Sequence, residues 1–277
     1  MIVHLIDGTY ELFRHFYGLR RFHKTDPPFG AVSGVLGMIA KMIEDGATHI
    51  GVATDHIIES FRNELWAGYK TGAGIDRALF AQFHPLEEAL AAMGVVVWPM
   101  VEYEADDALA AAAHLAAKNK RVEKVCIWTP DKDLAQCVVD DRVVQIDRRK
   151  NEIRNEAAIV AKFGVAPAFI ADYLALVGDS ADGYPGIKGL GARTAATLIN
   201  RCGHIEDFPP DVLSGANREL ALLFKDLAIL RTDIPLFKRV DELEWKGPAV
   251  SFDSIATKID APRLVERVRK LSRAVGT

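Results

Sequence analysis

The chain has 277 residues, of which 49% are hydrophobic and 26% charged, a composition typical of a globular protein and unlike that of a disordered one. This length suffices for one large α/β domain or two smaller domains, and the net charge of −4 argues, on its own, against nucleic-acid binding. The longest apolar run, residues 108–117, is about half a bilayer span, so we expect no membrane helix. Three widely spaced cysteines (Cys126, Cys137 and Cys202) favour reduced thiols and a cytoplasmic location.

Short β-branched runs alternate with helical patterns in the first 150 residues. The expected strands are residues 2–6, 49–54, 95–98, 124–129 and 142–146. The expected helices are residues 31–44, 75–93 and 105–118. Strands separated by helices of this length form βαβ units, so the predicted fold class is α/β with a mostly parallel central sheet flanked by helices. Active sites of such sheets form at the carboxyl ends of the strands.

Beyond residue 155 the pattern indicates helices alone. They are expected at residues 155–163, 167–177, 192–201 and 216–230, with a glycine-dense loop at residues 178–191. A basic stretch near the C-terminus, residues 263–273, is typical of the solvent-exposed face of a helix.

Acidic residues follow four of the predicted strands. In chain order they are Asp7, Asp55, then Glu104, Asp106 and Asp107, then Asp131 and Asp133. Positions i and i+2 of an extended segment share a face, as do i and i+3 of a helix, which pairs Asp131 with Asp133 and Glu104 with Asp107. One edge of a parallel sheet would then carry seven carboxylates, and Asp179 and Asp182 of the glycine-dense loop would make nine.

Such a cluster needs cations. Each acid alone could cap a helix or a turn, but capping gives no reason to place acids after every core strand. Two carboxylates ~4 Å apart repel by ~1 kcal/mol even in water, and by more in a cleft. Oxygen ligands without His or Cys favour Mg²⁺ or Mn²⁺. Without these nine acids the net charge becomes positive, which is compatible with a polyanionic substrate.

Several motifs resemble those of a known family. They are Tyr-Glu-Ala-Asp-Asp at 103–107, Thr-Pro-Asp-Lys-Asp-Leu at 129–134, Gly-Asp-Ser-Ala-Asp at 178–182 and Pro-Gly-Ile-Lys-Gly-Leu-Gly at 185–191. Ser-Phe-Arg at 60–62 and Gly-Tyr-Lys at 68–70 match further motifs. From Asp7 to about Leu230 the chain resembles the bacterial 5′-nuclease family, which comprises flap endonucleases and the 5′→3′ exonuclease domain of DNA polymerase I, in its stand-alone form.

The resemblance implies a structure-specific phosphodiesterase with a PIN-like core. Its substrates would be branched, flapped or nicked DNA, RNA-primed DNA included, cut near a 5′ end in replication and repair. It would act as a monomer, away from membranes, and two Mg²⁺ (or Mn²⁺) ions ~3.5–4 Å apart would serve the reaction.

The resemblance also implies roles for individual residues in the matching motifs. The first metal cluster would consist of Asp7, Asp55, Glu104, Asp106, Asp131 and Asp133, with Asp107 beside them. Asp179 and Asp182, with Asp131 or Asp133, would hold the second ion. The expected catalytic residues are Asp7, Asp131, Lys70 and Arg62. Asp131 is expected to be indispensable, and Lys70 and Arg62 are expected to contact the scissile phosphate from the base of a helical arch.

The resemblance also implies three regions. Residues 1–154 would form the nuclease core, with the arch at about 66–83 and Arg77 on it as a DNA contact. Here the chain departs from the family pattern, because Gly72 and Gly74 stand where many relatives carry an arginine soon after Gly-Tyr-Lys. Residues 155–235 would form an all-helical subdomain, and residues 236–277 a segment that packs on the core.

A helix–hairpin–helix element is expected within the all-helical subdomain. Closely spaced glycines let backbone N–H groups approach phosphates, and the N-terminus of the following helix favours anions. The residues expected to bind DNA here are Gly186, Lys188, Gly189, Gly191, Arg193 and Thr194. In the family this element grips duplex DNA and carries a potassium ion on its carbonyl groups. Gly183 and Ala181 stand where relatives usually have Asn and Ser.

Three other functions share single features with this sequence. Residues 5–9 resemble the end of a haloacid-type phosphatase motif, but that chemistry needs an aspartate nucleophile at the position of Leu5. A PIN-like ribonuclease shares the acid cluster, although Asp179 and Asp182 beside the glycine hairpin favour duplex DNA. A DNA-binding relative without catalysis is the third alternative, and the presence of every motif acid argues against it.

Overall fold

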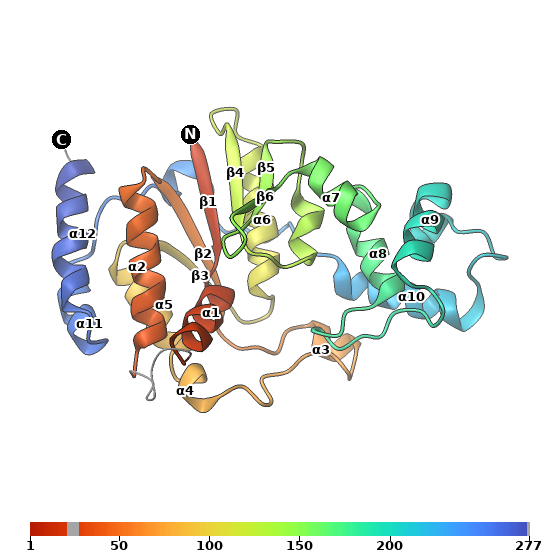
Figure 1. Ribbon diagram of the computed structural model, residues 1–277, viewed down its shortest axis with the longest axis horizontal. Coiled ribbons are helices and arrows are strands. Elements are labelled where there is room, and N and C mark those ends of the chain that lie inside the picture. The colour runs from red at the N-terminus through yellow and green to blue at the C-terminus, as the bar shows by residue number, and fades with distance from the viewer. Residues whose placement is uncertain (21–27, 276–277) are drawn as a thin grey trace.

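A six-stranded sheet forms the centre of the molecule. The computed structural model describes residues 1–20 and 28–275 (Figure 1). The strands are β1 (Ile2–Asp7), β2 (His49–Asp55), β3 (Val96–Met100), β4 (Lys124–Trp128), β5 (Val143–Asp147) and β6 (Glu152–Arg154). Their order is β3-β2-β1-β4-β5-β6, and only β6 runs antiparallel to its neighbour. The predicted mostly parallel α/β fold is confirmed. The short strand β6 was not predicted, because two of its three residues are exposed and leave no hydrophobic signal.

Helices cover both faces of the sheet (Figure 1). The side chains of β1 alternate between these two faces. Val3 and Leu5 are buried against α6 (Ala105–Ala117), whereas Ile6 is buried with α1 (Gly8–Arg20), α2 (Gly30–Glu44) and α5 (Phe83–Ala92). Successive residues of a strand point to opposite faces, so one apolar strand serves two cores. Helices α11 (Phe252–Lys258) and α12 (Pro262–Val275) pack outside α2 and α5, with Phe252 and Val268 buried.

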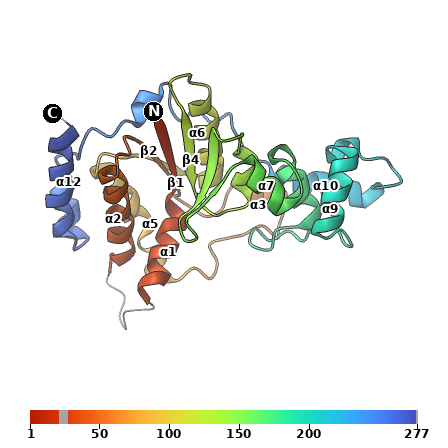
Figure 2. The same cartoon turned by 45° about the horizontal axis from the view of Figure 1, so that its top comes forward.

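A second group of helices lies to one side of the sheet, at the right in Figures 1 and 2. It comprises α7 (Glu156–Phe163), α8 (Ile170–Val177), α9 (Ala192–Cys202) and α10 (Gly215–Ala228), which share a hydrophobic cluster of their own. Short 3₁₀ helices precede α8 (η2, Pro167–Phe169) and lie at η1 (Asp133–Cys137), η3 (Ile205–Asp207) and η4 (Val240–Leu243). Among the described residues no single helix is long and apolar enough to cross a membrane. Only α7 and the helical segment 167–177, taken together, have sufficient length and apolar composition, and the two are bent by 47° relative to each other.

Two helices differ from expectation. The predicted helix at 75–93 is divided into α4 (Arg77–Phe80) and α5. Between them, the buried side chain of Gln82 accepts the N–H groups of Ala31 (3.2 Å) and Val32 (3.3 Å) at the start of α2. Pro85, which lacks an N–H group, must also lie in the first turn of a helix. Helix α1 was not predicted, since aromatic and charged residues alternate around it. Residues 66–76 form turns and extended backbone rather than a helix.

The sheet brings the predicted acids to one edge. β1 and β4 are neighbours, although the chain forms β2 and β3 between them, so the winding of the sheet reverses at this pair. Crevices at the carboxyl ends of strands open at such a point. Asp7 ends β1 there, and the segment with Asp131 and Asp133 follows β4.

Arg62 and Asp107 form a buried ion pair beneath this edge. Arg62, at the start of α3 (Arg62–Leu65), is 1% exposed, and its Nη1 and Nη2 lie 2.7 Å from the two oxygens of Asp107. Its Nε and Nη2 also donate to the carbonyl groups of Leu227 (2.8 Å) and Ile229 (3.0 Å). Asp107 accepts further bonds from backbone N–H groups, including that of Glu104 (3.0 Å).

The expected roles of Arg62 as a phosphate contact and of Asp107 as a metal-site carboxylate are therefore wrong. Asp107 is fully buried, because at the third position of α6 it turns back to cap the helix instead of facing outward beside Glu104. Arg62 directs its donors to this carboxylate, to Glu104 and to backbone carbonyl groups on either side of the C-terminal end of α10. Together the two residues join α3, α6 and the chain after α10.

Replacing Arg62 by alanine should lower the free energy of unfolding by about 3–5 kcal/mol, because the buried charge of Asp107 loses its partner. Urea denaturation followed by circular dichroism measures this loss. Arg77→Ala, at an exposed position of α4, is the matched control and should change stability by less than about 0.5 kcal/mol. An Arg62→Ala protein as stable as the wild type would show that the ion pair contributes nothing.

Candidate metal centre

Asp7 is oriented by groups from two neighbouring strands. The backbone N–H of Tyr10 donates to its Oδ1 (2.8 Å), and the hydroxyl of Thr129, just after β4, donates to its Oδ2 (3.0 Å). Burial and the nearby charges of Asp55 and Asp131 together raise the pKa of Asp7 to about 7, although these two hydrogen bonds act to lower it. A carboxyl group in this position gains most from a cation that favours its ionised form. The role of Thr129 was missed, because a threonine before proline signals only a turn.

Asp106, Asp131 and Asp133 form the first group of carboxylates. One oxygen of each lies within 4.8 Å of the others. Asp131 and Asp133 do meet, but through a turn in which the N–H of Asp133 donates to Oδ1 of Asp131 (3.0 Å), not along an extended segment. Burial raises the pKa of both Asp106 and Asp133 well above the usual value, and the charge of Asp131 adds to this at each.

Asp133, Asp179 and Asp182 form the second group, again with one oxygen of each within 4.8 Å of the others. Asp133 therefore belongs to both groups. Its Oδ1 is buried and has no hydrogen-bond donor among the described residues. A buried acceptor without a partner costs free energy, and a cation between the two groups would satisfy it. The donor set, made only of carboxylates, fits hard divalent ions.

Two lysines lie beside the second group, and one of them also contacts Glu104. Lys70 Nζ lies 2.7 Å from Glu104 Oε2 and 2.9 Å from Asp182 Oδ1. Burial opposes its charge, but Glu104 and Asp182 raise the pKa of Lys70 well above its usual value, so it stays an ammonium group. Lys132 Nζ lies 2.7 Å from Asp179 Oδ2. Lys132 was not predicted to take part, although a lysine directly between two motif acids was a usable signal.

Asp55 and Glu104 lie at the rim of the cluster on the side of α6. The N–H of Ala105 donates to Asp55 Oδ1 (2.8 Å), while burial raises the pKa of Asp55. Glu104 accepts the hydroxyl of Ser60 (2.7 Å). Burial alone would raise the pKa of Glu104, but Lys70 and Arg62 lower it. Both oxygens of Glu104 thus already have positively charged or hydrogen-bonding partners.

The glycine-dense loop divides into a packed and an open part. A Cβ atom on Gly186 would lie 2.4 Å from the backbone nitrogen of Gly178, so Gly186 serves the internal fold of the loop. Gly189, with φ of 88°, and Gly191 have no atoms within 4 Å of a built Cβ and are exposed. Lys188, Arg193 and Thr194 are exposed beside them, at the N-terminus of α9. Arg77 is exposed as well, but on α4.

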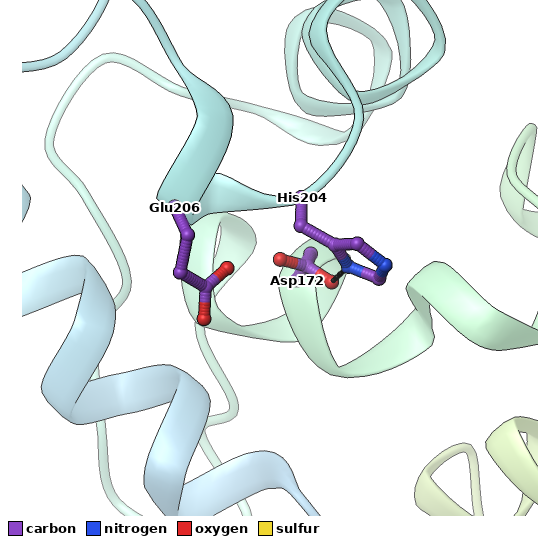
Figure 3. Close-up of side chains that lie close together, drawn as sticks. All are labelled: Asp172, His204 and Glu206. Carbon is purple, nitrogen blue, oxygen red and sulfur yellow. Dashed lines mark hydrogen bonds and ion pairs between the residues drawn. The ribbon is translucent and has the colours of Figure 1, made fainter.

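A third group with metal-binding side chains lies in the helical part, where Asp172, His204 and Glu206 face one another (Figure 3). His204 Nδ1 lies 2.9 Å from Asp172 Oδ2. Lys225 Nζ lies 2.7 Å from Asp172 Oδ1 and 2.6 Å from Glu206 Oε2. A lysine thus already supplies the positive charge, and this group is an ion-pair network that joins α8, η3 and α10.

Comparison with known proteins agrees with this geometry. The family "5′-3′ exonuclease, N-terminal resolvase-like domain" matches residues 2–164, and "5′-3′ exonuclease, C-terminal SAM fold" matches residues 165–251. A 5′-3′ exonuclease of Aquifex aeolicus is 29% identical over 283 residues, which cover 98% of this chain and 96% of that protein. DNA polymerase I of Rhizobium leguminosarum is 34% identical over 260 residues, but this chain spans only 25% of that protein.

A solved structure shares the fold. The flap endonuclease D15 of bacteriophage T5, in a complex with DNA and metal ions, matches 100% of both chains with a TM-score of 0.59 and 16% sequence identity. Matches to both family domains extend over the strand-end acids, Lys70 and the glycine-dense loop. The chain belongs to the 5′-3′ exonuclease family.

Proposed function

We propose that this protein is a structure-specific, metal-dependent 5′ nuclease that hydrolyses phosphodiester bonds of branched, flapped or nicked DNA. The observation that carries the proposal is Asp133, whose unpartnered buried oxygen lies where two groups of three carboxylates meet. Membership of the 5′-3′ exonuclease family supports the same reaction. Leu5 is fully buried in β1, so the phosphatase alternative lacks an aspartate nucleophile at this motif position.

Two Mg²⁺ or Mn²⁺ ions would be held by the two groups, with Asp133 shared between them. When bound, such ions supply an activated water and stabilise the leaving oxygen of a phosphodiester. Asp7, fixed by Tyr10 and Thr129, would complete the first group through its remaining acceptor capacity. Lys70 would bind a non-bridging oxygen of the reacting phosphate, because its ammonium group lies between Glu104 and Asp182, at the edge of the second group.

The remaining DNA would be held away from the acids. Gly189 and Gly191 leave open backbone that a phosphate can approach, and Lys188, Arg193 and Thr194 flank it. The same proposal has three further parts. A potassium ion would bind to the carbonyl groups of this loop. Residues 66–83 would form an arch with Arg77 as a DNA contact, and the protein would act as a monomer.

The purified protein should cut a labelled 5′-flap duplex with Mg²⁺ or Mn²⁺ and stop in excess EDTA, because the clustered carboxylates bind DNA phosphate only through cations. Product lengths on a denaturing gel measure the reaction. Undiminished cutting in EDTA, or no cutting of any branched or nicked DNA with Mn²⁺, would contradict the proposal.

The two carboxylate groups should respond differently to neutralisation. Asp131→Asn keeps an oxygen that can accept the N–H of Asp133 but removes a charge from the first group. It should abolish cleavage while DNA binding stays intact or tightens. Asp179→Asn alters only the second group and should raise the Mg²⁺ concentration needed for half-maximal rate. Wild-type turnover in Asp131→Asn would show that this assignment is wrong.

The basic side chains near the acids and those near the glycine-dense loop should have different roles in cleavage and binding. Lys70→Ala should lower single-turnover cleavage about 10²-fold with little loss of binding, because charge shifts at its phosphate during the reaction. Replacing Lys188 and Arg193 by alanine should weaken binding and reduce the salt dependence of log K by about 0.9 per lost phosphate contact, with cleavage near normal at saturating enzyme. Salt titrations and single-turnover rates of both variants provide the comparison, and the reverse pattern would overturn it.

A further inference from the structure

The loop that carries Lys70 is joined to the loop that carries the second group of carboxylates. We name residues 66–70 the base loop and residues 179–184 the outer acid loop. The backbone N–H of Lys70 donates to the carbonyl of Asp182 (2.9 Å). The indole N–H of Trp66 donates to the carbonyl of Gly183 (3.0 Å). These two bonds connect segments more than a hundred residues apart in the chain.

Two glycines permit this contact. Gly183 has a φ of 85°, and a Cβ atom on it would lie 2.0 Å from the carbonyl oxygen of Gly68. A Cβ atom on Gly68 would in turn lie 2.7 Å from the indole nitrogen of Trp66. Real Cβ atoms do not approach other atoms so closely, so any side chain at Gly183 would push the two loops apart. The bare backbone at both positions is a requirement of this contact.

Both loops are also fixed by contacts with neighbouring helices. The side-chain amide of Asn63 donates to the carbonyl of Lys70 (2.9 Å), which ties the base loop to α3. The rings of Trp66 and of Tyr184 pack on Phe224 of α10, with centroids 5.2 and 5.4 Å away. Gly183 and Tyr184 donate their N–H groups to the carbonyl of Asp179 (2.9 and 3.0 Å), so the outer acid loop is a closed turn. A shift of one loop therefore reaches the carboxylates of the other.

This contact sets where Asp182 lies relative to Lys70. Asp182 Oδ1 lies 2.9 Å from Lys70 Nζ, and Asp182 shares the second carboxylate group with Asp133, which follows β4. Asp182 lies in the outer acid loop, whereas Asp133 begins η1, about fifty residues earlier in the chain. We propose that Trp66, Gly68 and Gly183 are positioning residues that hold Asp182 at Lys70 and at Asp133; this rests on the proposed nuclease function.

Two variants test the proposal. Gly183→Ala should separate the loops through its clash with Gly68, and Trp66→Phe should remove only the indole donor while its ring still packs on Phe224. Both should weaken Mn²⁺ binding at one of two sites about 10- to 100-fold, the range typical when a group that orients a metal ligand is lost. Electron paramagnetic resonance of Mn²⁺ added to the protein without DNA measures this binding independently of cleavage. The Mg²⁺ concentration for half-maximal cleavage should rise correspondingly.

Gly46→Ala is the matched control. Gly46 has a φ of 97°, so alanine there introduces comparable backbone strain, but no atom lies within 4 Å of its Cβ position. It should bind Mn²⁺ and cut flap DNA as the wild type does. Thermal unfolding of all variants separates a metal effect from a loss of fold, and Trp66→Phe carries the test if Gly183→Ala does not fold.

The outcomes separate this inference from the proposed function. Normal Mn²⁺ binding and a normal Mg²⁺ midpoint in Trp66→Phe, or in a folded Gly183→Ala, would overturn the positioning role while wild-type cleavage left the nuclease function standing. A wild-type protein that binds Mn²⁺ but cuts no branched DNA would refute the function, and the Mn²⁺ comparison would still decide whether the loops position Asp182. Weakened binding in both variants, with Gly46→Ala unchanged, supports the inference.

Discussion

Mutual repulsion among carboxylates at one sheet edge is the constraint on which the rest of this structure depends. Asp7, Asp106 and Asp133 all have raised pKa values, first because they are buried and then because other acids lie beside them. Such an arrangement persists only if the scaffold supplies hydrogen bonds and counter-charges. Tyr10 and Thr129 supply hydrogen bonds to Asp7, and Lys70 and Lys132 supply charge at the margins. A cation bound between the acids would relieve the repulsion that remains after these contacts.

The acid cluster could be predicted from sequence because it follows from the topology. Parallel strands end at one edge, so residues such as Asp7 and Asp131 meet even though more than a hundred residues separate them. The orientation of the Asp107 side chain could not be inferred in the same way. Spacing along a helix does not say whether a carboxylate faces outward or caps the helix. The pair Glu104 and Asp107 in fact has the spacing of a capping box, and that signal could have separated Asp107 from the metal-site acids.

Long-range side-chain contacts account for most of the remaining differences. Arg62 belongs to a recognisable motif, but its burial depends on carbonyl groups at Leu227 and Ile229 that no local pattern connects to it. The side chain of Gln82, directly before α5, accepts N–H groups in the first turn of α2. In both cases a polar side chain satisfies backbone groups of a distant segment, and hydrophobic periodicity carries no information about such a choice.

The acidic groups differ in how their charge is balanced, so residue type alone does not define a metal site. Asp172, His204 and Glu206 have ligand atoms as closely spaced as those around Asp133, and they include a histidine. However, the ammonium group of Lys225 lies within hydrogen-bond distance of both acids there, and the N–H of Ile205 donates to Asp172 (2.9 Å). Around Asp133 the lysines reach only the outer partners, Asp179 and Asp182, and one buried oxygen remains without a donor. The unsatisfied acceptor, rather than the number of acids, therefore distinguishes a site that needs a cation from one whose charge is already balanced.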